Sequence, residues 1–158
     1  MEYVILMLVC GVFYYGMRYL TQNRHISSIP LSDITDPGIQ ELAESMVSFL
    51  NQVYGVQSKP PRIKLSNLSG EDIVYDPNEQ PAAQYDYKLK MILLDPNYMR
   101  YLGNDIRTLS IYMSHEWKHY TDHLEGITYE SVGWEVCEAR ANKFQKEGSR
   151  KILENLEL

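Results

Sequence analysis

The chain has 158 residues and a formal net charge of −6, with no cluster of basic residues. This length is sufficient for one domain with its own hydrophobic core. The acidic balance argues against nucleic acid as a partner. The two cysteines, Cys10 and Cys137, have neither zinc-ribbon spacing nor the number needed for a disulfide framework, so we expect free thiols and a reducing compartment.

Residues 3–20 form an almost wholly apolar stretch. A membrane-spanning helix needs about 20 residues, with a range of about 17–25, so this stretch predicts a membrane anchor within residues 1–22. A cleaved signal peptide fits poorly, because Glu2 stands where a positive charge is expected and no small-x-small cleavage site follows. A buried core helix is the other alternative. Arg18 and Arg24 lie toward the C-terminal side of the stretch, and the positive-inside rule then predicts a single-pass membrane protein with a cytoplasmic domain.

Residues 23–38 are polar, carry prolines and predict a linker. The remaining residues, 39–158, are expected to form one α+β domain. Its first helix should begin at Asp36-Pro37, which reads as an N-cap followed by proline at the first helical position. That helix should end at Gly55. Its predicted apolar stripe consists of Ile39, Leu42, Ala43, Met46, Leu50 and Val53.

A small β-sheet should follow the first helix. The predicted strands are Arg62–Leu65, Ile73–Tyr75 and a longer run, Ala83–Leu94, with turn-forming residues between them. The part from Tyr85 to Leu94 could be an edge strand, to which an extended peptide would add by backbone hydrogen bonds. An interior strand is the alternative.

The next helix should cover the stretch 109–126, because no Gly or Pro interrupts it before Gly126. Asn104 or Asp105 could cap its N-terminus, and Gly126 would end it. Its predicted core face is an apolar stripe with three- and four-residue spacing: Ile106, Leu109, Met113, Trp117, Tyr120 and Leu124.

This helix carries the motif His115-Glu116-x-x-His119. Positions four apart lie on one helical face, so both imidazoles can aim at one point. Two neutral imidazoles suit Zn²⁺, and Glu116 beside the metal could take a proton from a bound water molecule. The alternative is an ordinary core helix with incidental histidines.

A catalytic zinc ion takes three protein ligands and keeps one position open for water. His123 shares the helical face, but the eight residues that separate it from His115 rise about 12 Å, which is too far for one ion. A final helix, predicted from Ser131 into the 140s with a break at Gly148, supplies carboxylates instead. The candidates for the third ligand are His123, Glu130, Glu135 and Glu138.

The segment Glu138-Ala-Arg-Ala-Asn-Lys-Phe144 resembles the Glu-x-x-Ala-Asn/Asp-x-Phe stretch on the glutamate helix of gluzincin metallopeptidases. With the His-Glu-x-x-His motif, residues 115–144 are similar to the ImmA/IrrE-type family and to the HtpX-type and CAAX-prenyl-protease membrane enzymes. The resemblance implies His115, His119 and Glu138 as zinc ligands. It also implies Glu116 as the general base.

The residues around Glu138 support its choice as a ligand. Ala139 and Ala141 are small and would let two helices approach closely around an ion. Asn142 lies one turn after Glu138 on the same face, so its side-chain oxygen is predicted to accept the free N–H of a ligand histidine.

Together these features predict a membrane-anchored, zinc-dependent metallopeptidase that acts on peptide or protein substrates. A further donor must stabilise the oxyanion, for which Tyr120 and Tyr129 are candidates. The alternative is a non-catalytic module, tethered to the membrane through residues 3–20, in which the metal is structural or absent. Peptide deformylases use the same motif but need an upstream cysteine ligand, and Cys10 lies in the predicted anchor.

Overall fold

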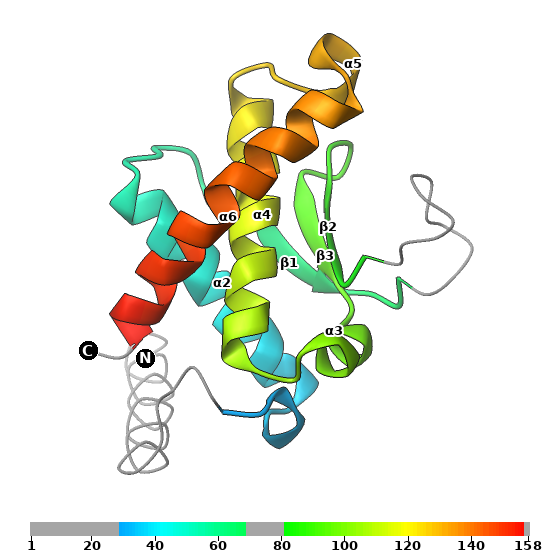
Figure 1. Cartoon of the computed structure of the whole chain (residues 1–158), viewed down its shortest axis with the longest axis vertical. Coiled ribbons are helices and arrows are strands. Elements are labelled where there is room, and N and C mark those ends of the chain that lie inside the picture. The colour runs from blue at the N-terminus through cyan, green and yellow to red at the C-terminus, as the bar shows by residue number, and fades with distance from the viewer. Residues whose placement is uncertain (1–28, 69–80, 157–158) are drawn as a thin grey trace, which may run out of the picture.

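The computed structural model describes residues 29–68 and 81–156, in which helices pack against a small sheet (Figure 1). The predicted α+β order of helix, small sheet, motif helix and glutamate helix is confirmed. The predicted anchor and the predicted strand Ile73–Tyr75 lie outside the described residues. Within the described ranges, none of the helices combines the length and apolar character needed to cross a membrane. In chain order the elements are η2 (Leu31–Asp33), α2 (Asp36–Val53), β1 (Arg62–Leu65), β2 (Ala83–Asp86), β3 (Met91–Leu94), α3 (Pro96–Leu102), α4 (Ile106–Leu124), α5 (Tyr129–Val132) and α6 (Trp134–Leu156).

The sheet has the order β1-β3-β2, with β1 parallel and β2 antiparallel to β3. The predicted long run Ala83–Leu94 is therefore a hairpin, which corrects the expectation of one continuous strand. Asp86 makes the turn possible, because its carboxylate accepts the backbone N–H groups of Lys88 and Leu89, both at 2.8 Å. Among the described strands, β2 pairs with β3 alone and forms an edge, whereas β3 is interior.

The N-cap of α2 lies one residue before Asp36, the predicted cap, and the helix begins at Asp36 itself. Thr35 is the N-cap, and its side chain accepts the backbone N–H of Gly38. Before the helix, Leu31 is fully buried in the core, and Arg100 of α3 donates a hydrogen bond to its carbonyl oxygen at 3.3 Å. Residues 29–38, which the sequence assigned to a linker, thus pack as part of the domain.

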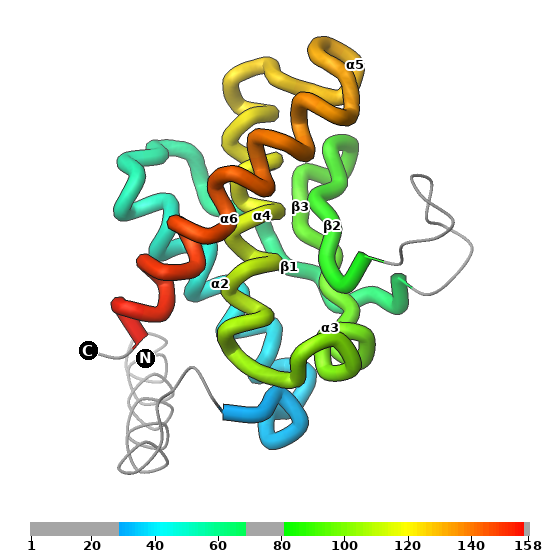
Figure 2. Tube along the Cα trace, in the orientation of Figure 1, coloured from blue at the N-terminus to red at the C-terminus, as the bar shows by residue number. Residues whose placement is uncertain are grey.

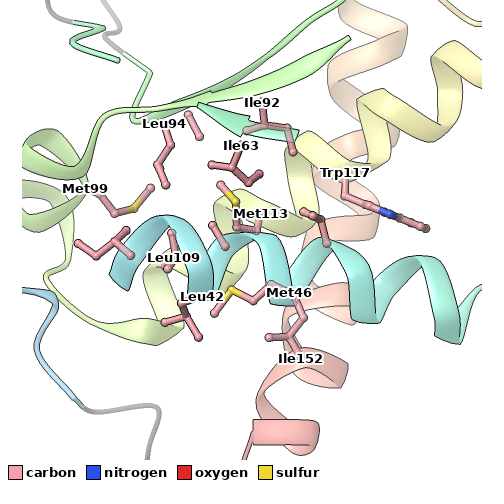
Figure 3. Packing of buried hydrophobic residues seen from close by; sticks show 14 of the residues in the cluster. Leu42, Met46, Ile63, Ile92, Leu94, Met99, Leu109, Met113, Trp117 and Ile152 are labelled. Carbon is pink, nitrogen blue, oxygen red and sulfur yellow. The ribbon is translucent and has the colours of Figure 1, made fainter. Parts of the chain in front are cut away.

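Helix α4 forms the centre of the fold, with its apolar stripe against α2 and the sheet (Figure 3). Asp105 caps it as predicted, accepting the N–H of Thr108 at 2.6 Å. Five of the six residues predicted for the stripe are buried, but Leu124 in the last turn is 51% exposed. The labelled core residues are Leu42, Met46, Ile63, Ile92, Leu94, Met99, Leu109, Met113, Trp117 and Ile152.

Helix α6 runs across α4, and the chain reaches it through the short helix α5 (Figure 2). The helix predicted from Ser131 is thus divided at Gly133, whose φ of 90° suits glycine. Gly148 does not break α6, contrary to prediction. It is buried where a Cβ atom would lie 2.8 Å from the Cβ atom of Ser114, so its lack of a side chain lets α6 approach α4 closely.

Candidate metal centre

Three side chains meet between α4 and α6: His115 and His119 of α4 and Glu138 of α6. The two Nε2 atoms are 3.1 Å apart, and each lies 3.2 Å from one oxygen of Glu138. One ligand atom from each side chain lies within 4.8 Å of the others, so the group could hold a metal ion. Ligands about 2.0–2.1 Å from a tetrahedral zinc ion are themselves separated by about 3.3 Å, which fits these distances.

Both histidines are oriented by hydrogen bonds at their other ring nitrogen. Nδ1 of His115 lies 3.2 Å from Oε1 of Gln145, and Nδ1 of His119 lies 3.4 Å from the hydroxyl oxygen of Tyr87. A proton on each Nδ1, donated to these oxygens, leaves the Nε2 lone pair free for a metal. The surroundings of the group therefore favour the tautomer that a metal ligand needs.

The sequence-based choice of Asn142 as the acceptor is wrong. Asn142 is exposed on α6, and Gln145 contacts His115 instead. Because α6 runs antiparallel to α4, the next turn of α6 after Glu138 and Asn142 reaches back toward the earlier histidine. Gln145 follows Glu138 by seven residues, two turns along the same helical face. This spacing is the signal that could have identified Gln145 as the acceptor.

Glu116, the predicted general base, is 6% exposed and does not belong to the ligand group. Its carboxylate accepts the backbone N–H of Tyr85 on β2 at 2.6 Å. Burial raises the pKa of Glu116, although the neighbouring His115 and His119 act in the opposite direction. The hydrogen bond fixes the carboxylate between the metal group and the edge strand.

The electrostatics of Glu138 and His115 favour a carboxylate beside a positive charge. Burial tends to raise the pKa of Glu138, but hydrogen bonds with both histidines outweigh it and lower the pKa to about 2. Burial tends to lower the pKa of His115, but its hydrogen bond with Glu138 and the charge of Glu116 raise it above the ordinary value. A bound cation would satisfy the same preference.

The other predicted candidates lie outside the group. Glu130 and Glu135 are exposed, and His123 is hydrogen bonded through Nδ1 to the hydroxyl of Tyr85 at 3.0 Å. Of the two tyrosines, Tyr129 donates to Oε1 of Glu138 at 3.2 Å, whereas Tyr120 donates to the carbonyl of Lys59 at 2.7 Å. Tyr129 alone of this pair therefore contacts a ligand.

Comparison with known proteins adds no relative: no family model, curated protein or solved structure matches the chain. The chemistry of the site is therefore argued from its own residues. Two imidazoles, one carboxylate and a neighbouring buried carboxylate form a donor set that could hold a divalent cation beside a proton acceptor.

Proposed function

We propose that this chain is a zinc-dependent metallopeptidase. The observation that carries the proposal is the convergence of His115, His119 and Glu138 on one point, with Glu116 buried beside them. Two nitrogen ligands and one oxygen ligand match catalytic zinc sites, which keep a fourth position open. The hydrogen bonds at both Nδ1 atoms support the same conclusion, since they present Nε2 to the metal.

Zinc bound there would polarise a peptide carbonyl and make a water molecule acidic enough to attack it near neutral pH. Glu116 would take the proton of the attacking water and deliver it to the leaving amine. Burial raises the pKa of Glu116, which brings this carboxylate closer to the range useful for proton transfer at neutral pH. The Tyr85 N–H holds the carboxylate in place while the proton moves.

Tyr129 is the better of the two candidate oxyanion donors. Its hydroxyl lies 3.2 Å from a ligand oxygen, whereas Tyr120 donates to the carbonyl of Lys59. Burial raises the pKa of Tyr129, so the phenol stays protonated and able to donate. A hydroxyl beside the metal group suits the position where negative charge develops on the substrate oxygen.

The proposal includes a peptide or protein substrate that lies along β2 and a membrane anchor within residues 1–22. The edge position of β2 among the described strands supports the first part. The apolar stretch 3–20 supports the second, and Arg18 and Arg24 at its C-terminal side favour a cytoplasmic domain. Recovery of the full chain in the soluble fraction of lysed cells would contradict the anchor.

One observation favours the rival function, a non-catalytic membrane-tethered module. The carboxylate of Glu116 is buried and hydrogen bonded to the backbone of Tyr85, so it also joins α4 to β2. A residue with that structural role would be retained in a protein whose metal is structural or absent.

The Glu116→Gln variant of the full chain separates the two functions. The amide oxygen can still accept the Tyr85 N–H, so the variant should fold and keep its zinc. It cannot act as the base, so hydrolysis of an unstructured protein substrate should fall by about 10²–10⁴-fold. Zinc-loaded wild-type protein without hydrolytic activity would favour the rival, whereas equal hydrolytic activity in both proteins would exclude Glu116 as the general base.

Metal analysis of ligand variants tests the site itself. His115→Ala, His119→Ala and Glu138→Ala should each lose the zinc that the wild type retains through purification, because a site with two protein ligands binds weakly. Glu135→Ala, on the first turn of α6, is the matched control and should keep it. Retention in Glu138→Ala with loss in Glu135→Ala would mean that the wrong carboxylate was chosen.

A further inference from the structure

A second polar contact joins α4 to α6 beside the ligand group. Asp122 of α4 has a side chain that is 1% exposed, and Arg140 of α6 binds both of its oxygens. The Nε–Oδ2 and Nη2–Oδ1 distances are both 2.8 Å. Lys118, one turn earlier on α4, pairs with the same carboxylate. Burial alone raises the pKa of Asp122, but the hydrogen bonds from Arg140 and Lys118 outweigh it and lower the pKa below its ordinary value.

This pair lies about one helical turn from the ligands. Asp122 follows His119 by three residues, and Arg140 follows Glu138 by two. A turn of helix advances about 5.4 Å, so a small rotation or slide of α6 at Arg140 would be transmitted to Glu138. The ligand contact it would disturb is short, with Nε2 of His119 3.2 Å from Oε1 of Glu138.

The opposite end of the interface is packed differently. There, Gly148 lies against Ser114, and the hydroxyls of Ser110 and Ser149 are 2.6 Å apart. These contacts set the distance between the helices, but Gly148 and Ser149 lie ten and eleven residues after Glu138 along α6. The Arg140 guanidinium makes two parallel hydrogen bonds to the Asp122 carboxylate, so it constrains the relative orientation of α4 and α6 as well as their separation.

We propose that the Arg140–Asp122 pair fixes the rotation and height of α6 on α4, and thereby holds Glu138 against both histidines. Arg140 is on this view a positioning residue for the metal centre and takes no part in the chemistry. The inference deepens the proposed function and rests on its zinc site. It adds a second requirement for the metal site besides the three ligands, namely the two hydrogen bonds between Arg140 and Asp122.

Arg140→Gln is the test variant because its fold should survive. The Arg140 side chain is 39% exposed, so its removal leaves no large buried cavity. Asp122 keeps Lys118 as a partner, so its buried charge is not left alone. Lys118→Gln is the matched control, since it removes one cation from the same carboxylate but leaves the link to α6 intact. Arg140→Lys keeps the charge and loses the two parallel contacts.

The experiment measures zinc affinity of the full-length proteins by competition with a chromophoric chelator. Arg140→Gln should bind zinc roughly 10-fold more weakly than wild type, the lower end of the cost of losing a group that orients a metal ligand. Arg140→Lys should be intermediate, and Lys118→Gln should match wild type. The visible spectrum of the Co²⁺-loaded proteins should change in the Arg140 variants and stay unchanged in Lys118→Gln, which a mere loss of stability would not produce.

Equal zinc affinity in wild type and Arg140→Gln would overturn the inference, as would equal losses in Arg140→Gln and Lys118→Gln. If Arg140→Gln does not fold, wild-type affinity in Arg140→Lys overturns it. Failure of the wild type itself to bind zinc would instead remove the proposed function and this inference with it, so the two failures are distinguishable.

Discussion

The two sides of α4 carry different kinds of side chain. Toward α2 and the sheet, α4 presents large apolar side chains, among them Leu109 and Met113. Toward α6 it presents small or polar groups, among them Ser114, the two histidines and Asp122. Both sides are largely buried, yet the first side gains its stability from apolar area and the second from directional polar contacts.

This difference separates the side of α4 that packs the core from the side that carries the proposed metal site. On the apolar side, a small shift changes the hydrophobic free energy little, because that energy depends on buried area and has no preferred direction. The polar side does not tolerate small shifts, because hydrogen bonds and metal–ligand bonds weaken steeply when their angles or distances change. We therefore expect substitutions on the apolar side to change the free energy of unfolding, and substitutions on the polar side to change metal affinity.

The largest effect on stability is expected from Met113→Ala. Met113 is fully buried, and truncating such a residue costs about 2–5 kcal/mol in the free energy of unfolding. The neighbouring variant Ser114→Ala, on the other side of the helix, loses one hydrogen bond to the Ser110 carbonyl and should cost about 0.5–1.5 kcal/mol. Chemical denaturation of both variants measures the contrast. Similar costs for the two would show that the sides of α4 are not energetically distinct.

The largest effect on the polar side, apart from the ligands themselves, is expected from Gln145→Ala. Loss of the hydrogen bond to His115 should weaken zinc binding about 10–100-fold, while the free energy of unfolding of the metal-free protein changes little. Asn142→Ala, on the same helix and exposed, is the matched control and should bind zinc like the wild type. Chelator competition decides the point, and a loss in Asn142→Ala alone would restore the sequence-based assignment.

A smaller effect is expected from Gly148→Ala. The added Cβ atom would lie 2.8 Å from Ser114 and 2.7 Å from the Phe144 ring, and such overpacking costs about 1–3 kcal/mol. Replacing glycine by alanine inside a helix raises the free energy of unfolding by about 1 kcal/mol, so we expect a net decrease of about 1 kcal/mol. Adding Ser114→Gly should relieve the contact with Ser114 but not the contact with Phe144, and a double-mutant cycle in denaturant measures the coupling between positions 114 and 148. An increase in stability from Gly148→Ala alone would mean that the helices separate without cost.

Local patterns predicted the features that depend on neighbours along the chain. The i, i+4 spacing of His115 and His119 places both on one face of any helix, and Asp105 caps that helix through a backbone N–H three residues away. The apolar spacing of α2 and α4 likewise identified ten of the twenty residues of the core cluster, because helical periodicity depends on sequence alone, although Val53 of the predicted α2 stripe is 42% exposed. The α+β order of elements followed from these patterns.

Glu138 is an intermediate case. The sequence favoured it through its resemblance to a glutamate helix, and the structure brings its carboxylate to both histidines. The sequence did not identify the residue of α6 that contacts His115 beside Glu138. Asn142 and Gln145 both follow Glu138 at helical spacing, and only the antiparallel crossing of α6 over α4 gives the contact with His115 to Gln145.

The tertiary structure alone decided the remaining features. Gly148 interrupts a helix in isolation, but here it is the residue that allows close packing against Ser114. Tyr85 reaches Glu116, and Tyr87 reaches His119, only because β2 and the turn after it lie beside α4. Periodicity along the chain specifies which residues share a face, whereas contacts between faces depend on how the elements cross. That crossing is set by the shapes of side chains distant in sequence, which no local pattern contains.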